Sequence, residues 1–164
     1  MGIEADFSLE AFEQLMNAIP DIIASEIVRA FSYLGEQCVR RVRDRSAQES
    51  WIDQTGNLRS SIGYAVYEDG RVLIESAFEQ VGSGTQGGSE GRRLVEELAS
   101  KYSETYALVI VAGMSYAEYV EAKNNKDVLA STELWARSKM NEYLERAKER
   151  AENKVRQLQK QLGL

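Results

Sequence analysis

Histidine is absent from the 164-residue sequence, and cysteine and proline occur once each, as Cys38 and Pro20. A single cysteine cannot form a disulfide within one chain. Without histidine there is also no Cys/His zinc site and no Ser-His-Asp or Cys-His catalytic arrangement. No apolar run approaches the roughly 20 residues that span a bilayer. The usual groups for hydrolytic or metal-dependent catalysis are therefore missing, and no membrane partner is expected.

Positive charge is in the minority. The chain has 20 Lys+Arg against 26 Asp+Glu, which gives a net charge of −6. Phosphate backbones repel such a chain, so direct sequence-specific nucleic-acid binding is not expected. Acidic residues also stand near the N-terminus, where a secretory signal would carry Lys or Arg. We expect a soluble protein made in a reducing cytoplasm, with the length of one domain.

Apolar residues at spacings of three and four predict helices in the first part of the chain. Ser8 can cap a short helix over residues 9–18. Pro20 then suits the first turn of a second helix, which is expected to run to about Ser46.

The C-terminal part is expected to be one long helix that opens at Ser131 or Thr132 and lasts nearly to Leu164. Beyond Leu144 its apolar stripe becomes too narrow for a core but suits a partner helix. Residues 131–164 hold eight Lys+Arg and five Glu, a net charge of +3, so the other residues sum to −9. This asymmetry suits pairing between copies or with another partner, and a solvated helix with i,i+4 pairs explains it equally well.

Period-two alternation predicts a β-hairpin between residues 62–66 and 72–78. Asp69-Gly70 lies between the two strands, and a type I′ turn needs positive φ at both central residues. The continuous apolar run Tyr106–Ala112 predicts a central strand covered on both faces.

Two further helices are expected, over residues 89–102 and 116–123, with a short strand over 127–129. The predicted fold class is α+β: a small, mainly antiparallel sheet packed by a long N-terminal helix and a long C-terminal helix. Residues 1–144 would form a single domain, and 145–164 would extend the last helix.

Residues 80–91 hold five of the twelve glycines and form the one obvious flexible loop. Gly82–Gly87 satisfies the pattern GxGxxG, which binds dinucleotides when it lies in a parallel βαβ unit. Here the preceding strand is the second arm of a hairpin, which is the wrong context. A flexible loop is therefore the favoured interpretation.

Glu118 and Glu121 would share one face of a short helix, and two carboxylates can act as acid and base. Solvated helix faces explain them better. The arginines between Arg40 and Arg45 could contact phosphate, but a helix C-terminus with salt bridges is favoured. A small phosphate- or nucleotide-binding enzyme that uses the glycine loop and the carboxylate pair remains an alternative.

Two short segments carry a resemblance. Residues 53–62 read DQTGNLRSSI, and residues 116–121 read YAEYVE after the apolar strand. In this order they resemble the tail-completion or head–tail joining proteins of tailed bacteriophages, often described as minor tail components. The resemblance covers about residues 20–145. The residues of this family motif are Thr55, Gly56, Asn57, Leu58, Arg59, Ile62, Tyr116, Ala117, Val120 and Glu121.

The first segment also has a physical interpretation of its own. Gly56 permits a backbone conformation that other residues resist, and Asn57 can cap the short helical turn after it. Leu58 and Ile62 lie four apart and can pin the turn to the core. These roles are structural and predict no catalysis.

The resemblance implies a non-enzymatic protein of the head–tail junction in a phage or prophage. It would form a homo-oligomeric ring that contacts portal or adaptor and tail-tube proteins. It would reside in the virion after assembly in the host cytoplasm. No catalytic residue, cofactor or metal ion is expected.

We expect the loop over residues 80–91 and the helix from about Glu145 to be the assembly surfaces. The alternative from another class is a small interaction module that dimerises through its C-terminal helix without forming a ring.

Overall fold

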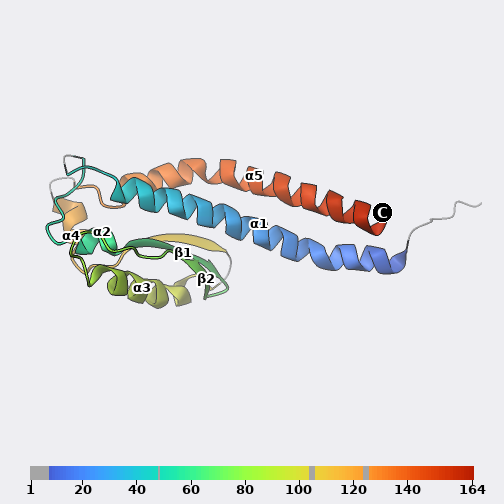
Figure 1. The fold of residues 1–164 in the computed structure, drawn as a ribbon, viewed down its shortest axis with the longest axis horizontal. Helices are drawn as coiled ribbons and strands as arrows, with labels where there is room; N and C mark the ends of the chain where they lie inside the picture. The colour runs from blue at the N-terminus through green and yellow to red at the C-terminus, as the bar shows by residue number, and fades with distance from the viewer. Residues whose placement is uncertain (1–7, 48, 104–105, 124–125) are drawn as a thin grey trace, which may run out of the picture. The chain divides into compact units, whose positions relative to one another are not determined.

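The computed structural model describes residues 8–47, 49–103, 106–123 and 126–164 (Figure 1). The α+β class, with a small antiparallel sheet and a long helix toward each end, is confirmed. No helix among these residues is long and apolar enough to cross a membrane. The elements in chain order are α1 (Leu9–Arg43), α2 (Asn57–Ser60), β1 (Ile62–Glu68), β2 (Arg71–Glu75), α3 (Gly87–Leu98), the 3-10 turn η1 (Ala99–Lys101), β3 (Ala107–Ala112), α4 (Ala117–Ala122) and α5 (Ala130–Leu162).

The chain forms two compact units. The sheet unit is Phe31–Met140, and the helical unit combines residues 8–30 with Asn141–Leu164. The helices α1 and α5 each contribute residues to both units. The expectation that residues 1–144 form a single domain stays a prediction.

Helix α1 is continuous, whereas the sequence predicted a break before Pro20. The hydroxyl of Ser8 accepts a hydrogen bond from the Ala11 amide at 3.3 Å, as expected of an N-cap. Pro20 lies inside the helix and removes one hydrogen-bond donor. The apolar stripe on both sides of Pro20 explains why the helix continues, since tertiary packing can outweigh propensity. The helix ends at Arg43, slightly before the predicted Ser46.

The sheet has the strand order β2-β1-β3, and both pairs are antiparallel. The predicted hairpin is confirmed, because β1 and β2 are joined at Asp69 and Gly70, whose φ angles are +48° and +77°. Positive φ at both positions is what the type I′ turn requires. A bulge between Val66 and Tyr67 interrupts the register with β2.

The central, doubly covered strand is β1, so the prediction that residues 106–112 would occupy this place is wrong. Six of the seven β1 residues are buried, whereas β3 is an edge strand with mostly half-buried residues. The continuous apolar run of β3 is typical of a buried strand, but β1 holds Gly63 where the Phe78 ring approaches closely, and Ala65 in the buried cluster with Phe78 and Val95. Small residues at covered positions weakened the hydrophobic signal of the true central strand.

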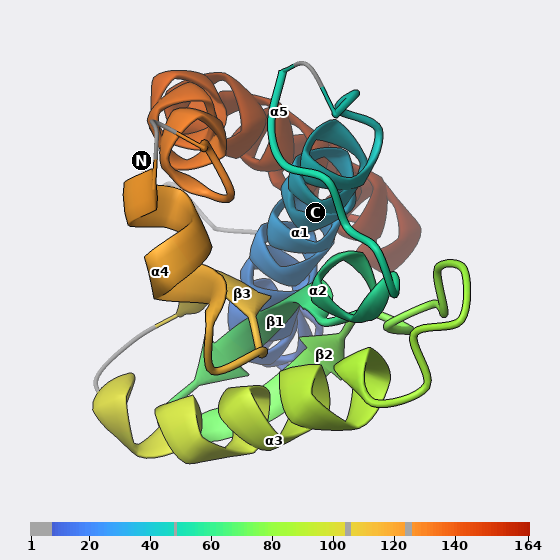
Figure 2. The ribbon, with the colours of Figure 1, turned by 90° about the vertical axis from the view of Figure 1, so that its left-hand side faces the viewer.

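Both faces of β1 are occupied within the sheet unit (Figure 2). On one face a Cβ on Gly35 of α1 would lie 2.5 Å from the Tyr64 ring, so helix and strand are in close contact. On the other face Ala65 and Tyr67 join a buried cluster with Val95 of α3. The Tyr67 hydroxyl donates to the Val95 carbonyl at 2.8 Å, and burial raises the pKa of Tyr67 to about 12.

Two local predictions differ from the structure. Helix α3 begins at Gly87 rather than Ser89 and ends at Leu98, because residues 99–101 of the predicted helix form the 3-10 turn η1. No strand forms over residues 127–129. The Asp127 carboxylate accepts a hydrogen bond from the Ser131 amide at 3.0 Å, so this segment leads into α5 instead.

The helical unit is an antiparallel pair, residues 9–30 of α1 beside residues 141–162 of α5 (Figure 1). Glu26 is only 1% exposed, and its carboxylate pairs with Arg150 at 2.5 Å and Lys154 at 2.6 Å. Burial alone would raise the pKa of Glu26, but its hydrogen bonds and attraction to these two cations hold that pKa below its usual value.

Candidate functional site

The first family segment is built around helix α2. Gly56 precedes the helix with φ +80°, and a Cβ there would lie 1.9 Å from the Val81 carbonyl oxygen, so only glycine fits. The Asp53 carboxylate accepts hydrogen bonds from the Gly56 amide at 2.9 Å and the Arg59 amide at 2.7 Å. The cap of α2 is therefore Asp53, and the prediction that Asn57 caps this helix is wrong.

Asn57 instead caps a different helix. Its side-chain oxygen accepts hydrogen bonds from the Gln86 amide at 3.1 Å and the Gly87 amide at 3.3 Å, where α3 begins. Asn57 is thus the first residue of α2, and its side chain caps the N-terminus of α3. Two amides that a phosphate would need at the start of α3 are already engaged.

The glycine-rich loop packs tightly against α2. A Cβ on Gly84 would lie 2.5 Å from the Gly56 carbonyl carbon, and one on Gly87 would lie 2.2 Å from the Asn57 carbonyl oxygen. Gly91 is also buried, with the Phe78 ring 2.3 Å from an added Cβ. These glycines permit close backbone approach, so the composition that suggested a flexible loop has a packing function here.

Arg59 joins the segment to the end of α1. Its guanidinium donates to the backbone carbonyl of Arg43 and to the Trp51 carbonyl at 3.5 Å, and it lies 4.6 Å from the centre of the Trp51 ring. In return, the Arg43 guanidinium donates to the Arg59 carbonyl at 3.2 Å and the Ile62 carbonyl at 2.8 Å. The two arginines thereby satisfy carbonyls at the end of α1 and in the segment.

The second family segment lies on α4 and just before it. Its last residue, Glu121, caps the N-terminus of α5. Its carboxylate accepts hydrogen bonds from the amides of Val128 at 3.1 Å, Leu129 at 2.8 Å and Ala130 at 3.1 Å. Glu118 is exposed. The interpretation of both carboxylates as a solvated face holds for Glu118 and is wrong for Glu121.

Arg45 supports the same helix start. Its guanidinium pairs with Asp127 at 2.5 Å and donates to the hydroxyl of Thr132. Arg41 lies 5.2 Å from the centre of the Trp135 ring. The prediction that the arginines at the end of α1 form salt bridges is confirmed for Arg45 and for Arg43, which pairs with Glu79 at 3.7 Å. The side chain of Arg41 contacts an aromatic ring instead.

The two segments meet in the sheet unit. Leu58 and Ile62 from the first share a buried cluster with Ala117 from the second. Beside this cluster, Thr55 and Leu58 line an open groove of about 450 Å³ together with Tyr116 and Val120. Asn57, Arg59 and Glu121 do not line the groove and hold the surrounding helix ends instead.

The rim of the groove is apolar and basic. Ile52 is 74% exposed and Tyr119 64%, and both line it. Lys123 lies 5.4 Å from the centre of the Tyr119 ring, and Lys126 also lines the groove. Burial, with the nearby Asp53 charge, raises the pKa of Tyr116. This surface offers apolar, aromatic and ammonium contacts, which is the chemistry of a binding surface.

Trp51, Asp53 and Ser60 also shape this site, and sequence reasoning assigned no function to Asp53 or Ser60. Trp51 forms a buried wall of the groove, and its indole N–H has no acceptor among the described residues. Asp53 could have been found, because an Asp shortly before a Gly-Asn turn is a typical cap. The Ser60 hydroxyl accepts a hydrogen bond from the Val81 amide at 2.7 Å. These residues lie 21 positions apart, so no local sequence pattern predicts the contact.

Within residues 8–47, 49–103, 106–123 and 126–164, no group of three His, Cys, Asp or Glu residues is placed to hold a metal ion. Comparison with protein-family models, with curated proteins and with solved structures found no match to this chain.

Proposed function

We propose that this chain is a structural protein of the head–tail junction in a tailed phage or prophage, where copies assemble as a ring that joins or completes the tail. One observation carries the proposal. The two segments that resemble this family lie together and use their polar side chains to hold helix ends. Beside them they leave an exposed groove with an apolar rim.

The groove suits contact with a neighbouring protein. Exposed Ile52, Tyr116 and Tyr119 would lose water-accessible apolar surface when covered, and aromatic residues are typical anchors of interfaces. Lys123 and Lys126 would favour an acidic neighbour. Since the chain is acidic overall, a second copy of it meets this requirement.

The enzyme alternative receives little support from the geometry. Glu121 and the amides of Gln86 and Gly87 are engaged in structural hydrogen bonds. Gly84→Val is no clean probe of a nucleotide site, because Gly84 touches the Gly56 backbone and the substitution would disturb the fold itself. Titration of the wild-type chain with ATP is the better test of that alternative, and we expect no binding.

The mass of the purified full chain tests the proposal, measured by native mass spectrometry over a concentration series. We expect closed rings of six or more copies, visible in negatively stained images, either alone or with co-expressed portal and tail-tube proteins from the same genome. Ile52→Glu and Tyr119→Glu should reduce the copy number. Leu134→Glu, at a position that is also exposed but does not line the groove, should not. Failure to form rings in both settings would contradict the proposal.

A further inference from the structure

The helical unit leaves an apolar stripe of α1 open to solvent. Leu9, Met16 and Ile23 are 66%, 51% and 45% exposed. Ile19 and Ile27 lie between and after them and are half-buried. These residues follow one another at spacings that keep them on one helix face. A water-facing stripe of this length is unusual for a helix of a soluble domain.

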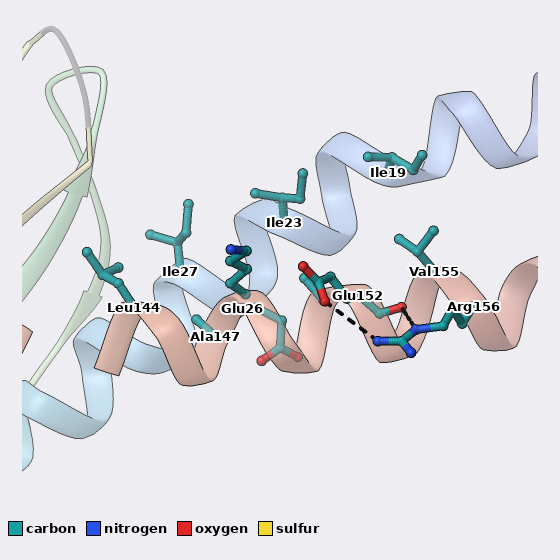
Figure 3. A pocket seen from close by; sticks show the side chains of 11 residues that line it. Ile19, Ile23, Glu26, Ile27, Leu144, Ala147, Glu152, Val155 and Arg156 are labelled. Carbon is teal, nitrogen blue, oxygen red and sulfur yellow. Dashed lines mark hydrogen bonds and ion pairs between the residues drawn. The ribbon is translucent and has the colours of Figure 1, made fainter. Parts of the chain in front are cut away.

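The stripe borders a groove along the α1–α5 seam. Figure 3 shows Ile19, Ile23 and Ile27 of α1 opposite residues of α5. The groove has a volume of about 670 Å³. Its apolar contributors from α5 are Leu144, Ala147, Ala151 and Val155.

Two helices cannot close this groove by themselves. Ala147 and Ala151 are buried in the seam, and their small side chains let the helices approach without covering the broader α1 stripe. Helical hairpins of this kind bury such stripes when further helices complete a bundle, commonly of four. Two more helices of matching length are therefore needed, and a second hairpin of the same chain supplies both.

The charges favour one arrangement of two hairpins. Residues 8–30 carry four acidic residues and one arginine, whereas residues 141–164 carry six Lys+Arg and four Glu. Within each hairpin Glu26 already pairs with Arg150 and Lys154, so the other charges of residues 8–30 sum to −2. Placing α1 beside the α1 of another copy would bring these net charges of −2 together. Placing α1 beside the other copy's α5, whose remaining charges balance next to the +1 of the paired trio, avoids this repulsion. A two-fold axis makes both such seams at once and closes the assembly.

We propose that a second copy of this chain covers the groove, so that α1 of each copy packs against α5 of the other in a four-helix bundle. Ile23 lies at the centre of the contact, with Met16 and Ile27 on either side. The pairing does not depend on the proposed head–tail function. It adds a contact between copies that is separate from the groove beside Tyr119.

Substitution within the stripe tests the pairing in the full chain. Native mass spectrometry should show pairs, or assemblies with an even number of copies. Ile23→Glu should weaken pairing at least about tenfold, because a carboxylate would be buried in an apolar contact. Met16→Glu repeats the test at a more exposed position, and Leu134→Glu, at an exposed position that lines neither groove, is the control. Circular dichroism of each variant shows whether the helices persist.

The outcomes separate this inference from the proposed function. Even-numbered rings that split into smaller assemblies on Ile23→Glu support both. Pairs without rings support the inference and contradict the ring. Rings whose copy number is unchanged by Ile23→Glu and Met16→Glu overturn the inference alone. A single chain at all concentrations overturns it as well.

A mixing experiment tests the choice of α5 as the neighbour of α1. One variant carries Glu10→Lys and Glu13→Lys in α1, and the other carries Arg156→Glu and Lys160→Glu in α5. Each alone should pair poorly, since like charges then face one another across both seams. Mixed, they should form hetero-pairs, identified by mass, because both seams regain opposite charges. Repulsion within one hairpin cannot be relieved by mixing, so absence of hetero-pairs overturns the arrangement.

Discussion

Helix α1 has two halves with the same apolar spacing and different coverage. In the sheet unit Leu34, Cys38 and Val42 are completely buried. In the helical unit about half of the surface of Met16 and of Ile23 is exposed to solvent. The first half of the helix lies beside α5 in the helical unit, whereas the second packs on β1 and on a cluster that contains Trp51. A periodic apolar pattern thus predicts which face of a helix is apolar. Whether that face is buried depends on the elements that pack against it.

The polar contacts of the two units differ in the same way. In the sheet unit several side chains form such contacts, since Asp53, Asn57 and Glu121 each cap a helix whose start lies at most 30 residues away in sequence. The helical unit relies on one buried carboxylate, Glu26, whose partners are more than a hundred residues away in sequence. The sheet unit should therefore tolerate the loss of any single cap, but not a change in its backbone contacts.

Gly87→Ala should cause the largest loss of stability. The added Cβ would meet the Asn57 carbonyl at 2.2 Å, where two backbones would have to separate. We expect the free energy of unfolding of the sheet unit to fall by about 3 kcal/mol. Urea unfolding followed by tryptophan fluorescence measures this loss. Gly88→Ala is the control in the same helix turn, with its nearest contact at 3.2 Å, and should change stability by less than about 1 kcal/mol.

Glu26→Gln should weaken the helical unit by about 1–2 kcal/mol at neutral pH, because charge-assisted bonds to Arg150 and Lys154 are lost. The folded-state pKa of Glu26 is lowered, so its ionisation stabilises the fold above the unfolded pKa, near 4.5. That stabilisation disappears as the pH falls through the lowered folded value. Hydrogen exchange of α1 amides at pH 7 and in acid should show the variant's deficit shrinking. A deficit independent of pH would mean that charge is not responsible.

Glu121→Ala should cost about 1–2 kcal/mol through the loss of three hydrogen bonds to the start of α5. Glu118→Ala, on the same short helix, should have almost no effect because Glu118 is exposed. Thermal unfolding of both variants makes the comparison. Equal effects would argue that Glu121 acts through general surface charge rather than as a cap.

Arg137→Gln should have the smallest effect, about 0.3–0.5 kcal/mol, since it removes one exposed i,i+4 pair with Glu133. The change should diminish further in high salt, which screens exposed pairs. Thermal unfolding of the variant and the wild-type chain at low and high salt measures both the loss of stability and its salt dependence. A loss as large as that from Glu121→Ala would show that exposed pairs contribute more to this fold than its caps do.

The sequence predicted the elements that depend on local chemistry. The Asp69-Gly70 turn, the Ser8 cap and the long C-terminal helix all follow from neighbouring residues. The sequence did not predict the features that depend on residues far away along the chain. The true central strand contains Gly63, which makes room for Phe78, and nothing in its own segment shows this.

The candidate site was predicted only in part. The motif residues were found, but the functions of Asn57 and Glu121 were not, because each caps a helix other than its own. Their targets lie 29 and 7 residues away along the chain. Trp51, Ile52 and Tyr119 gather at one groove only after α2 and α4 have been brought together.

The sequence separation of Glu26 and Arg150, 124 residues, sets an order of events during synthesis. A ribosome adds roughly 5–20 residues per second, so the partner of Glu26 emerges about 6–25 s later. Throughout that interval the face of α1 that carries Glu26 has no α5 to pack against. The helical unit is therefore the last part of the molecule to form, and on crowded polysomes its unfinished α1 is the segment most exposed to nascent neighbours and chaperones.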